Sequence, residues 1–364
     1  MLLVRSILFL SLVALLAAQF WALRLPSRLD LPPQQTVETN NLKIGVHTRL
    51  TGIGDEAYIR QSLQQVREMG ASWIVDLFPW TYTQPRSRYG LDWNGSDMVI
   101  QHAQRQGLTI VARIDQVPPW ARPSDTSGSY LEPAYYVDYA NYVVAFLERY
   151  RPYGVRHVII WNEPNLTIEW GQRPPDPVAY TDLLKVVYPQ VKAAVPDAIV
   201  IAGALSPGEQ LGDNAEVRMG DLDYMTAMYE AGAADYFDMW AVHPYGYILP
   251  HDDPPDPDVV NFRRTEVQRD IMISFGDEEK PLIITEGGWN DNTRWHAAVR
   301  PSQRLRWTVS AYEMAQEWEW MEAVCLWQFA LPEPTYTYHD NWNFVAPDGT
   351  PKAIYWAIQE AARR

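Results

Sequence analysis

From residue 42 to the C-terminus, the sequence alternates short apolar runs with segments in which apolar residues recur at helical spacing. The runs expected to form strands lie at residues 43–47, 73–78, 108–114, 155–161, 198–202, 237–243, 282–285 and 323–329. The segments expected to form helices lie at residues 56–69, 98–106, 135–150, 176–195, 221–231, 259–274, 301–318 and 352–361. The apolar runs are continuous rather than alternating, which is typical of parallel strands covered on both faces.

Eight successive strand–helix units predict a single-domain (β/α)8 barrel, the TIM-barrel fold, over residues 42–364. The alternative is a doubly wound open sheet. That fold is expected to carry a glycine-rich phosphate-binding turn after its first strand. The sequence at this point reads His47-Thr48-Arg49-Leu50, which contains no glycine. We therefore favour the barrel.

The N-terminal residues 1–24 are expected to lie outside the barrel. Arg5 precedes a long uncharged apolar stretch, a pattern that predicts a secretory signal peptide or a single membrane anchor. Cleavage after Ala17 or Ala18 would leave a leucine where a small residue is preferred, so we favour an uncleaved anchor. Both alternatives predict an exported protein, either secreted or anchored on the extracytoplasmic side of the membrane. Residues 25–41 are expected to form a linker.

The composition narrows the classes of partner. A net charge of −15 argues against nucleic-acid binding, because phosphate contacts require an excess of Lys and Arg. The 16 Trp and 21 Tyr residues suit either a large core or a groove in which rings stack on the apolar faces of sugars. Cys325 is the single cysteine and cannot form an intramolecular disulfide. It lies in an apolar run, so we expect a buried thiol.

Two of the predicted strands lead into a glutamate. The fourth run continues into Asn162-Glu163-Pro164, and the seventh continues into Thr285-Glu286. The carboxyl ends of all strands of a (β/α)8 barrel open on one mouth, where such barrels carry their active sites. Glycoside hydrolysis requires two carboxyl groups, one to protonate the leaving oxygen and one to attack the anomeric carbon or to activate water. We therefore predict Glu163 and Glu286 as a catalytic pair rather than as two solvated charges.

Polar residues close to this pair are candidates for substrate binding. Asn162 directly precedes Glu163 and is placed to hydrogen-bond a sugar hydroxyl. His243 ends the sixth predicted strand and is expected at the same mouth. Tyr245 follows two residues later and is placed to donate a hydrogen bond to Glu286.

Several rings near strand ends are further candidates. Trp80, Trp120 and Trp289 follow strands on the loop side, so each is interpreted either as a stacking platform for substrate or as a packing residue. Trp327 follows the eighth strand and is predicted to contact substrate. His47 ends the first strand and is interpreted either as a hydroxyl-binding residue or as a core histidine.

Four motifs carry a resemblance to a known group of enzymes. These motifs are Trp161-Asn162-Glu163-Pro164, His243-Pro244-Tyr245, Ile284-Thr285-Glu286-Gly287-Gly288-Trp289 and Leu326-Trp327-Gln328. In this order and on these strands, they resemble the large clan of retaining glycoside hydrolases built on (β/α)8 barrels, clan A. Within the clan, the chain is most similar to the xylosidase/iduronidase-like and cellulase-like families. The resemblance extends from about residue 42 to the end of the chain.

The resemblance implies that Glu163 is the general acid/base and Glu286 the nucleophile of a retaining mechanism. The two carboxyl groups should then lie about 5 to 5.5 Å apart, rather than the 6.5 to 9.5 Å typical of inversion. It also implies that Trp327 forms the floor of the subsite for the sugar under attack. The clan often places an arginine near the end of strand two to support the nucleophile. Asp76 lies on that strand here, so Arg113 on strand three is the candidate substitute.

The retaining mechanism requires neither a metal nor an organic cofactor, and we expect none. His251, Asp252 and Asp253 form a sequence cluster that could bind a metal, but a solvated loop is the favoured interpretation. No G-x-S-x-G or H-E-x-x-H motif indicates a different class of hydrolase.

The sequence thus predicts a retaining β-glycosidase that acts on an oligosaccharide or polysaccharide. One alternative is a transglycosylase, which uses the same carboxylates but excludes water. Another is a non-catalytic carbohydrate-binding barrel in polysaccharide synthesis or export, for which the loss of one glutamate would be expected. The loops at residues 166–176 and 204–220 suit either an open cleft for endo action or a closed pocket for exo action. The sequence leaves this choice, the sugar and the oligomeric state open.

Overall fold

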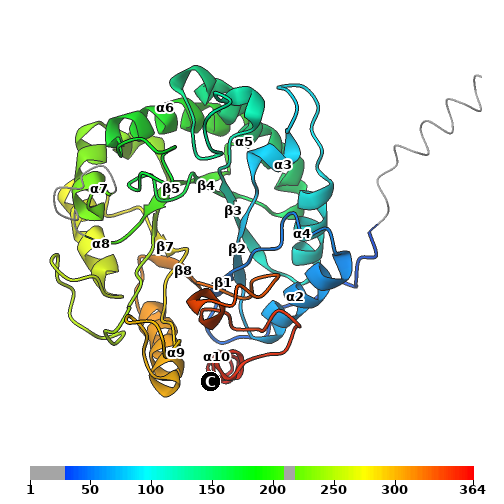
Figure 1. Ribbon diagram of the computed structural model, residues 1–364, viewed down its shortest axis with the longest axis vertical. Helices are drawn as coiled ribbons and strands as arrows, with labels where there is room; N and C mark the ends of the chain where they lie inside the picture. The colour runs from blue at the N-terminus through cyan, green and yellow to red at the C-terminus, as the bar shows by residue number, and fades with distance from the viewer. Residues whose placement is uncertain (1–28, 209–217) are drawn as a thin grey trace, which may run out of the picture. The chain divides into compact units, whose positions relative to one another are not determined.

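The computed structural model describes residues 29–208 and 218–364 (Figure 1). The chain divides into two units, Met1–Pro32 and Pro33–Arg364. The predicted signal or anchor segment lies outside the described residues, and the described part of the predicted linker contains neither helix nor strand. Among the helices within the described ranges, none combines the length and apolar character needed to cross a bilayer.

Eight parallel strands close into a barrel in the order of the sequence. These strands are Ile44–His47 (β1), Trp73–Leu77 (β2), Thr109–Ile114 (β3), His157–Ile160 (β4), Ile199–Leu205 (β5), Met239–Val242 (β6), Leu282–Ile284 (β7) and Met321–Leu326 (β8). The pairing of β1 with β8, in which Gly45 lies opposite Cys325, closes the ring. The predicted (β/α)8 barrel is confirmed, and the open-sheet alternative is wrong.

Helices surround the ring of strands (Figure 1). The α-helices of the described residues are Glu56–Glu68 (α2), Trp80–Thr83 (α3), Asn94–Arg105 (α4), Tyr136–Tyr150 (α5), Pro177–Ala194 (α6), Asp221–Glu230 (α7), Arg264–Ser274 (α8), Pro301–Gln316 (α9) and Ala353–Ala362 (α10). The short 3-10 helices of the same ranges are Pro119–Ala121 (η1), Pro133–Tyr135 (η2), Arg151–Tyr153 (η3), Ala233–Tyr236 (η4) and Tyr338–Asn341 (η5). The predicted strand–helix alternation is therefore present throughout the barrel.

Two helices begin away from their predicted positions. Asn94 and Gly95 resemble a turn in the sequence, but they form the first turn of α4, which begins earlier than expected. In contrast, α8 begins at Arg264, later than the predicted residue 259. The residues before it form a loop that is held by Asn261, whose amide donates to the Asp253 carboxylate at 2.7 Å.

The barrel interior is a separate apolar cluster enclosed by the strands. Its buried residues are Val75, Val111, Ile159, Ile201, Ala204, Met239, Ala241, Ile283, Ala323 and Cys325. Cys325 is a buried free thiol, as the sequence predicts. A Cβ atom on Gly45 would lie 2.4 Å from the Cys325 Sγ and 2.8 Å from the Trp73 Cβ, so the interior has no room for a side chain at this point.

The inward-facing rows of side chains continue into the polar mouth of the barrel. Side chains alternate between the two faces of a strand, so residues two apart share a face. The row of Val111 on β3 therefore continues to Arg113, and the row of Ala241 on β6 continues to His243. In the same way, β1 ends with His47. The alternation brings polar side chains from three strands above one apolar interior.

Candidate active site

Glu163 follows β4 in a turn with an unusual backbone conformation. Trp161 (φ 73°) and Glu163 (φ 38°) both adopt left-handed values that residues other than glycine rarely adopt. The Glu163 N–H donates to the Ala204 carbonyl of β5 at 3.0 Å. The buried amide of Asn165 donates to the Ser206 carbonyl at 2.9 Å and accepts from the Ser206 N–H at 2.8 Å. The neighbouring strand and its loop thus hold the turn in a strained form, as is common at functional sites.

Glu286 follows β7 and is hydrogen-bonded at both carboxylate oxygens. Arg113 Nη1 donates to Oε1 at 2.7 Å, and the Tyr245 hydroxyl donates to Oε2 at 2.7 Å. The predicted hydrogen bond from Tyr245 is therefore present, and Arg113 supplies the supporting arginine from β3. Asp76, at the β2 position, instead accepts a hydrogen bond from the Thr48 hydroxyl at 2.6 Å.

These contacts set the ionisation of Glu286. Burial alone raises the pKa of this carboxyl, but the electrostatic influence of His243 and of the Arg113 guanidinium, together with the Tyr245 hydrogen bond, outweighs burial and lowers the pKa to about 2. Glu286 is therefore a carboxylate over the whole neutral and mildly acidic range. A carboxylate in this state is competent to act as a nucleophile.

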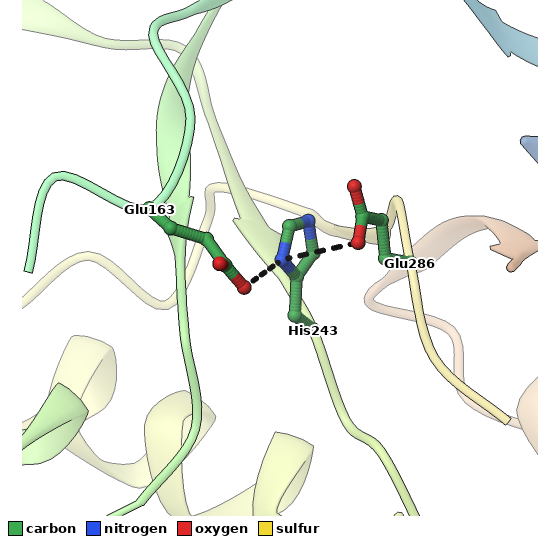
Figure 2. A group of neighbouring side chains, drawn as sticks. All are labelled: Glu163, His243 and Glu286. Atoms are coloured by element: carbon green, nitrogen blue, oxygen red, sulfur yellow. Dashed lines mark hydrogen bonds and ion pairs between the residues drawn. The ribbon is translucent and has the colours of Figure 1, made fainter. Parts of the chain in front are cut away.

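His243 lies between the two glutamates (Figure 2). Its Nδ1 is 2.9 Å from Glu163 Oε1 and 4.0 Å from Glu286 Oε2. Its Nε2 is 3.1 Å from the Thr285 hydroxyl. One oxygen of each carboxylate and one nitrogen of His243 lie within 4.8 Å of one another. The structure thus brings together the two glutamates and the histidine that the sequence predicts at one mouth.

The same three side chains form the group of potential metal ligands within the described part of the chain. Glu286, however, already accepts hydrogen bonds at both oxygens, and one of its partners is the positively charged Arg113. This charge disfavours a cation at the same carboxylate. In the other sequence candidate, the loop at residues 251–253, His251 lies 3.8 Å from Asp252, and the Asp253 carboxylate instead accepts a hydrogen bond from Asn261 at 2.7 Å.

Asn162, His47 and Trp327 lie around the carboxylate pair. Asn162 Oδ1 accepts from Arg113 Nη1 at 3.0 Å. His47 Nδ1 donates to the Thr48 carbonyl at 2.8 Å. His47 Nε2, which has no hydrogen-bond partner among the described residues, lies 3.7 Å from Glu286 Oε1. Burial, together with Arg113, lowers the pKa of His47 well below its usual value, so the ring is neutral and Nε2 is an acceptor.

Trp327 contacts the His47 ring, with 4.7 Å between centroids, and its side chain is partly exposed. Its role as a floor beneath a bound sugar stays a prediction.

For two of the three tryptophans that follow strands, the structure favours the packing interpretation over the stacking one. Trp80 is fully buried, and its indole N–H donates to the Gln84 side chain at 2.7 Å. Trp289 is 1% exposed and donates to the Leu249 carbonyl at 2.7 Å. Neither ring presents a free face to a ligand, because each turns away from the mouth into the core behind its strand. Trp120 is partly exposed and packs edge-on against Trp80, with 5.3 Å between centroids.

Sequence reasoning missed two acidic residues of the site. Asp115 lies just beyond β3, with Oδ2 3.5 Å from Arg113 Nε; its Oδ1 accepts no hydrogen bond within the described part of the chain. Burial raises the pKa of Asp115 to about 6. Burial and the nearby carboxylates of Asp115 and Glu163 raise the pKa of Glu169 to about 7. The strand periodicity contained a signal for Asp115, which continues the inward row of Arg113.

Sequence reasoning also missed a chain of contacting rings beside Glu286. Tyr245 contacts Trp342 at 5.2 Å and Tyr247 at 6.1 Å between centroids. Trp295 contacts Trp342 at 5.8 Å and stacks on Tyr338 at 4.7 Å. These rings come from the loops after β6, β7 and β8. Their proximity depends on loop conformation, for which the sequence contains no periodic signal.

Comparisons with known proteins support the fold. No protein-family model and no curated protein sequence matches the chain. Among solved structures, a family 39 glycoside hydrolase from Bacteroides cellulosilyticus is similar, with a TM-score of 0.69 and 20% identity over 92% of this chain and 65% of that one. A monomeric beta-xylosidase from Caulobacter crescentus is similar with a TM-score of 0.65 and 18% identity, over 91% of this chain and 70% of that one.

A third similar structure, GH5_18 from Bifidobacterium longum, has a TM-score of 0.64 and 15% identity, over 89% of this chain and 79% of that one. This chain thus spans slightly less than two thirds of the first of these proteins and about three quarters of the others. At these identities, the likeness shows that the chain shares the (β/α)8 barrel fold of these proteins.

Proposed function

We propose that this protein is a retaining β-glycosidase that hydrolyses glycosidic bonds of an oligosaccharide or polysaccharide by double displacement. The observation that carries this proposal is the geometry of Glu163 and Glu286. Their nearest oxygens lie within 4.8 Å, which suits direct attack on the sugar rather than the wider gap that accommodates a water in inverting enzymes. The low pKa of Glu286 supports the assignment of this residue as the nucleophile.

The reaction proceeds in two steps. A Glu286 oxygen attacks the anomeric carbon while the bond from this carbon to the leaving oxygen breaks, and Glu163 transfers its proton to the leaving oxygen. A water then gives a proton to the Glu163 carboxylate and attacks the same carbon, which releases Glu286 as a carboxylate. Two inversions at one carbon return the original configuration.

Three residues near the pair are proposed to bind the sugar under attack. The Asn162 amide nitrogen is placed to donate to a hydroxyl, since its oxygen is occupied by Arg113. His47 Nε2 is an acceptor beside Glu286 that has no partner in residues 29–208 and 218–364. Trp327 offers a partly exposed ring for stacking.

The acidic residues around the site favour a neutral sugar. Asp115 and Glu169 add two carboxyl groups to the catalytic pair, and Arg113 already serves Glu286. A sugar with its own carboxylate would bring a further negative charge into this buried cluster. We therefore expect aryl β-xylosides or β-glucosides to be better substrates than an aryl β-glucuronide; the beta-xylosidase among the similar structures makes the xyloside the first choice.

The proposal is tested with a panel of para-nitrophenyl β-glycosides and with Glu286→Ala and Glu163→Ala variants. Loss of the nucleophile should abolish turnover of every substrate. Loss of the acid should spare para-nitrophenyl glycosides, because the para-nitrophenolate group leaves without protonation. The same variant should cleave glycosides with poor leaving groups far more slowly. Wild-type turnover that persists in Glu286→Ala would contradict the mechanism. A folded wild-type protein that binds sugars but cleaves none would favour the carbohydrate-binding barrel.

We also propose that the protein is exported and held at the membrane by residues 1–24. The apolar character of this segment and its poor match to a cleavage site support an uncleaved anchor. The barrel would then face its polysaccharide on the extracytoplasmic side.

A further inference from the structure

Two adjoining cavities form a groove over the loops that follow β1 and β2. Its first part is a cavity of about 500 Å³ lined by the end of β2, including Asp76, and by residues of the loops after β1, β2 and β8, among them Arg49 and Glu333. Its second part is a cavity of about 460 Å³. Thr51 and Tyr82 line both cavities, so the two adjoin. Each has the volume of a typical small-ligand site.

Contacts connect this groove to the catalytic carboxylates. His47 lies 3.7 Å from Glu286, and its ring contacts that of Trp327. The Arg49 guanidinium lies 5.9 Å from the centre of the same Trp327 ring, and Arg49 lines the first cavity. The groove therefore begins beside the residues proposed to hold the sugar under attack.

The position of the proton donor gives the groove a direction. Glu163 follows β4 and must face the oxygen of the leaving group, so the leaving group lies on the β4 side of the bond. In the closed ring, β8 lies opposite β4, and β1 lies next to β8. The groove starts between the loops of β8, β1 and β2, on the side of the glycone, the part of the substrate that becomes bonded to Glu286.

The groove has a rigid floor. The fully buried Asp76 accepts hydrogen bonds from the Thr48 hydroxyl at 2.6 Å, the Leu50 N–H at 2.9 Å and the Thr51 N–H at 3.2 Å. These bonds fix the loop after β1 to the end of β2. A loop held at three points by a buried side chain is preorganised for a ligand rather than shaped by one.

Tyr82 provides an aromatic platform in the groove. Its side chain is 58% exposed, although its ring lies against Gly52 so closely that a Cβ there would be 2.5 Å from the ring. Gly52 also has a φ of +90°, a value that suits glycine. The loop thus supports the Tyr82 ring without covering it, and an exposed, supported ring suits stacking on the apolar face of a sugar.

We propose that this groove binds further sugar units on the glycone side, so that the enzyme cleaves within a β-linked polysaccharide and releases oligosaccharides rather than single sugars. The inference rests on the proposed glycosidase function and specifies its substrate. An enzyme that removes single terminal sugars needs a closed end next to the attacked unit. Here the glycone side of the site instead continues into the two adjoining cavities.

The test compares para-nitrophenyl β-glycosides that differ in the number of sugar units. The monosaccharide that the wild type cleaves is first identified among xylose, glucose, mannose and galactose. Its mono-, di- and trisaccharide aryl glycosides are then compared, with all products separated by size. We expect kcat/KM to rise by about tenfold or more from the mono- to the disaccharide substrate, and a polysaccharide of the same sugar to give oligosaccharides from the earliest time points.

Tyr82→Ala tests the groove itself. The variant should lose about tenfold in kcat/KM on the longer substrates, mainly through KM, and should change the monosaccharide substrate less than about twofold. Tyr153→Ala is the matched control, because Tyr153 is 37% exposed but lies in η3, before the start of β4 and away from the mouth. The Tyr153→Ala variant should have the same kcat/KM as the wild type on each of the mono-, di- and trisaccharide substrates.

The outcomes separate this inference from the proposed function. Turnover without a gain from chain length, or single sugars as the only products, would overturn the inference and leave the glycosidase function standing. Equal losses on all substrates in Tyr82→Ala would also overturn it. No turnover of any aryl glycoside or polysaccharide would contradict the function, and the inference with it.

Discussion

The state of Glu286 depends on side chains from other strands. Arg113 from β3 and Tyr245 from the loop after β6 each donate to one of its oxygens at 2.7 Å. Burial acts in the opposite direction and would favour the protonated form. A nucleophilic carboxylate at this place therefore requires its partners as much as the glutamate itself.

Replacing Arg113 with alanine should make this dependence visible. The variant removes the positive charge beside Glu286 and keeps the burial, so the pKa of Glu286 should rise. Because the carboxylate is the reactive form, the acid limb of the plot of kcat/KM against pH should move to higher pH. Below the new pKa, kcat/KM should fall about tenfold for each pH unit. The profile is measured on an aryl β-glycoside.

The control for this experiment is Arg151→Ala. Arg151 is half exposed and pairs with Asp197 at 3.0 Å, away from the mouth. The dependence of kcat/KM on pH should be the same in Arg151→Ala as in the wild type. An unshifted acid limb in Arg113→Ala would mean that Arg113 does not set the ionisation of Glu286.

Single residues of the site were predictable where they end a strand. Glu163, Glu286 and His243 follow β4, β7 and β6, and the barrel brings these ends together. Trp80 and Trp289 also follow strands, but a position after a strand does not fix the direction of the ring, and both turn into the core. The predicted substrate-binding roles of the other residues stay predictions.

At the scale of elements, the strands deliver the polar groups of the mouth by their alternation. The rows that fill the interior with small and branched side chains lead into His47, Arg113 and His243. This arrangement depends on the register of β1 against β8, where Gly45 lies opposite Cys325. A change in this register would displace His47 from Glu286.

Gly45→Ala should therefore destabilise the barrel. The added Cβ would meet the Cys325 Sγ at 2.4 Å and the Trp73 Cβ at 2.8 Å, and overpacking of this kind costs about 1 to 3 kcal/mol. Urea unfolding of the purified variant measures the loss. Gly95→Ala in α4 is the control, since its Cβ would meet the nearest heavy atom at 3.9 Å and alanine favours a helix. Equal unfolding midpoints for Gly45→Ala and the wild type would contradict the packing described for the interior.

The loops are the elements that the sequence predicts least well. Strand and helix periods repeat along the chain, whereas the contacts among Tyr247, Trp295, Tyr338 and Trp342 join loops after three different strands. The late start of α8 has the same origin, because a side-chain hydrogen bond from Asn261 holds the preceding residues out of the helix. Such contacts depend on the closed fold rather than on local pattern.

At the scale of the whole molecule, the order of strands and helices was sufficient to predict the barrel. Continuous apolar strands need cover on both faces, and eight strand–helix units provide this cover when the sheet closes. The closed barrel in turn places β4 and β7 at one mouth, so a pair of glutamates separated by 123 residues (286 − 163) becomes a pair within 4.8 Å.

The proposed anchor is tested on the full chain. Expressed with residues 1–24, the protein should sediment with membranes, and deletion of these residues should move it to the soluble fraction with its glycosidase activity intact. Fractionation followed by detection of the barrel domain measures both forms. A full-length protein in the soluble fraction would refute the anchor and favour a cleaved signal peptide.

The pairing of Glu163 with Glu286 in a double displacement is tested most directly by trapping the covalent intermediate. With an activated fluorosugar of the preferred monosaccharide, hydrolysis of the glycosyl-enzyme is slowed more than its formation. The sugar therefore stays bonded to the enzyme. Intact mass and peptide mapping should place one sugar on Glu286, and Glu163→Ala should still become labelled, because the activated leaving group needs no proton. A label on another residue, or a wild-type enzyme that turns over aryl glycosides with inversion and takes up no label, would contradict the account.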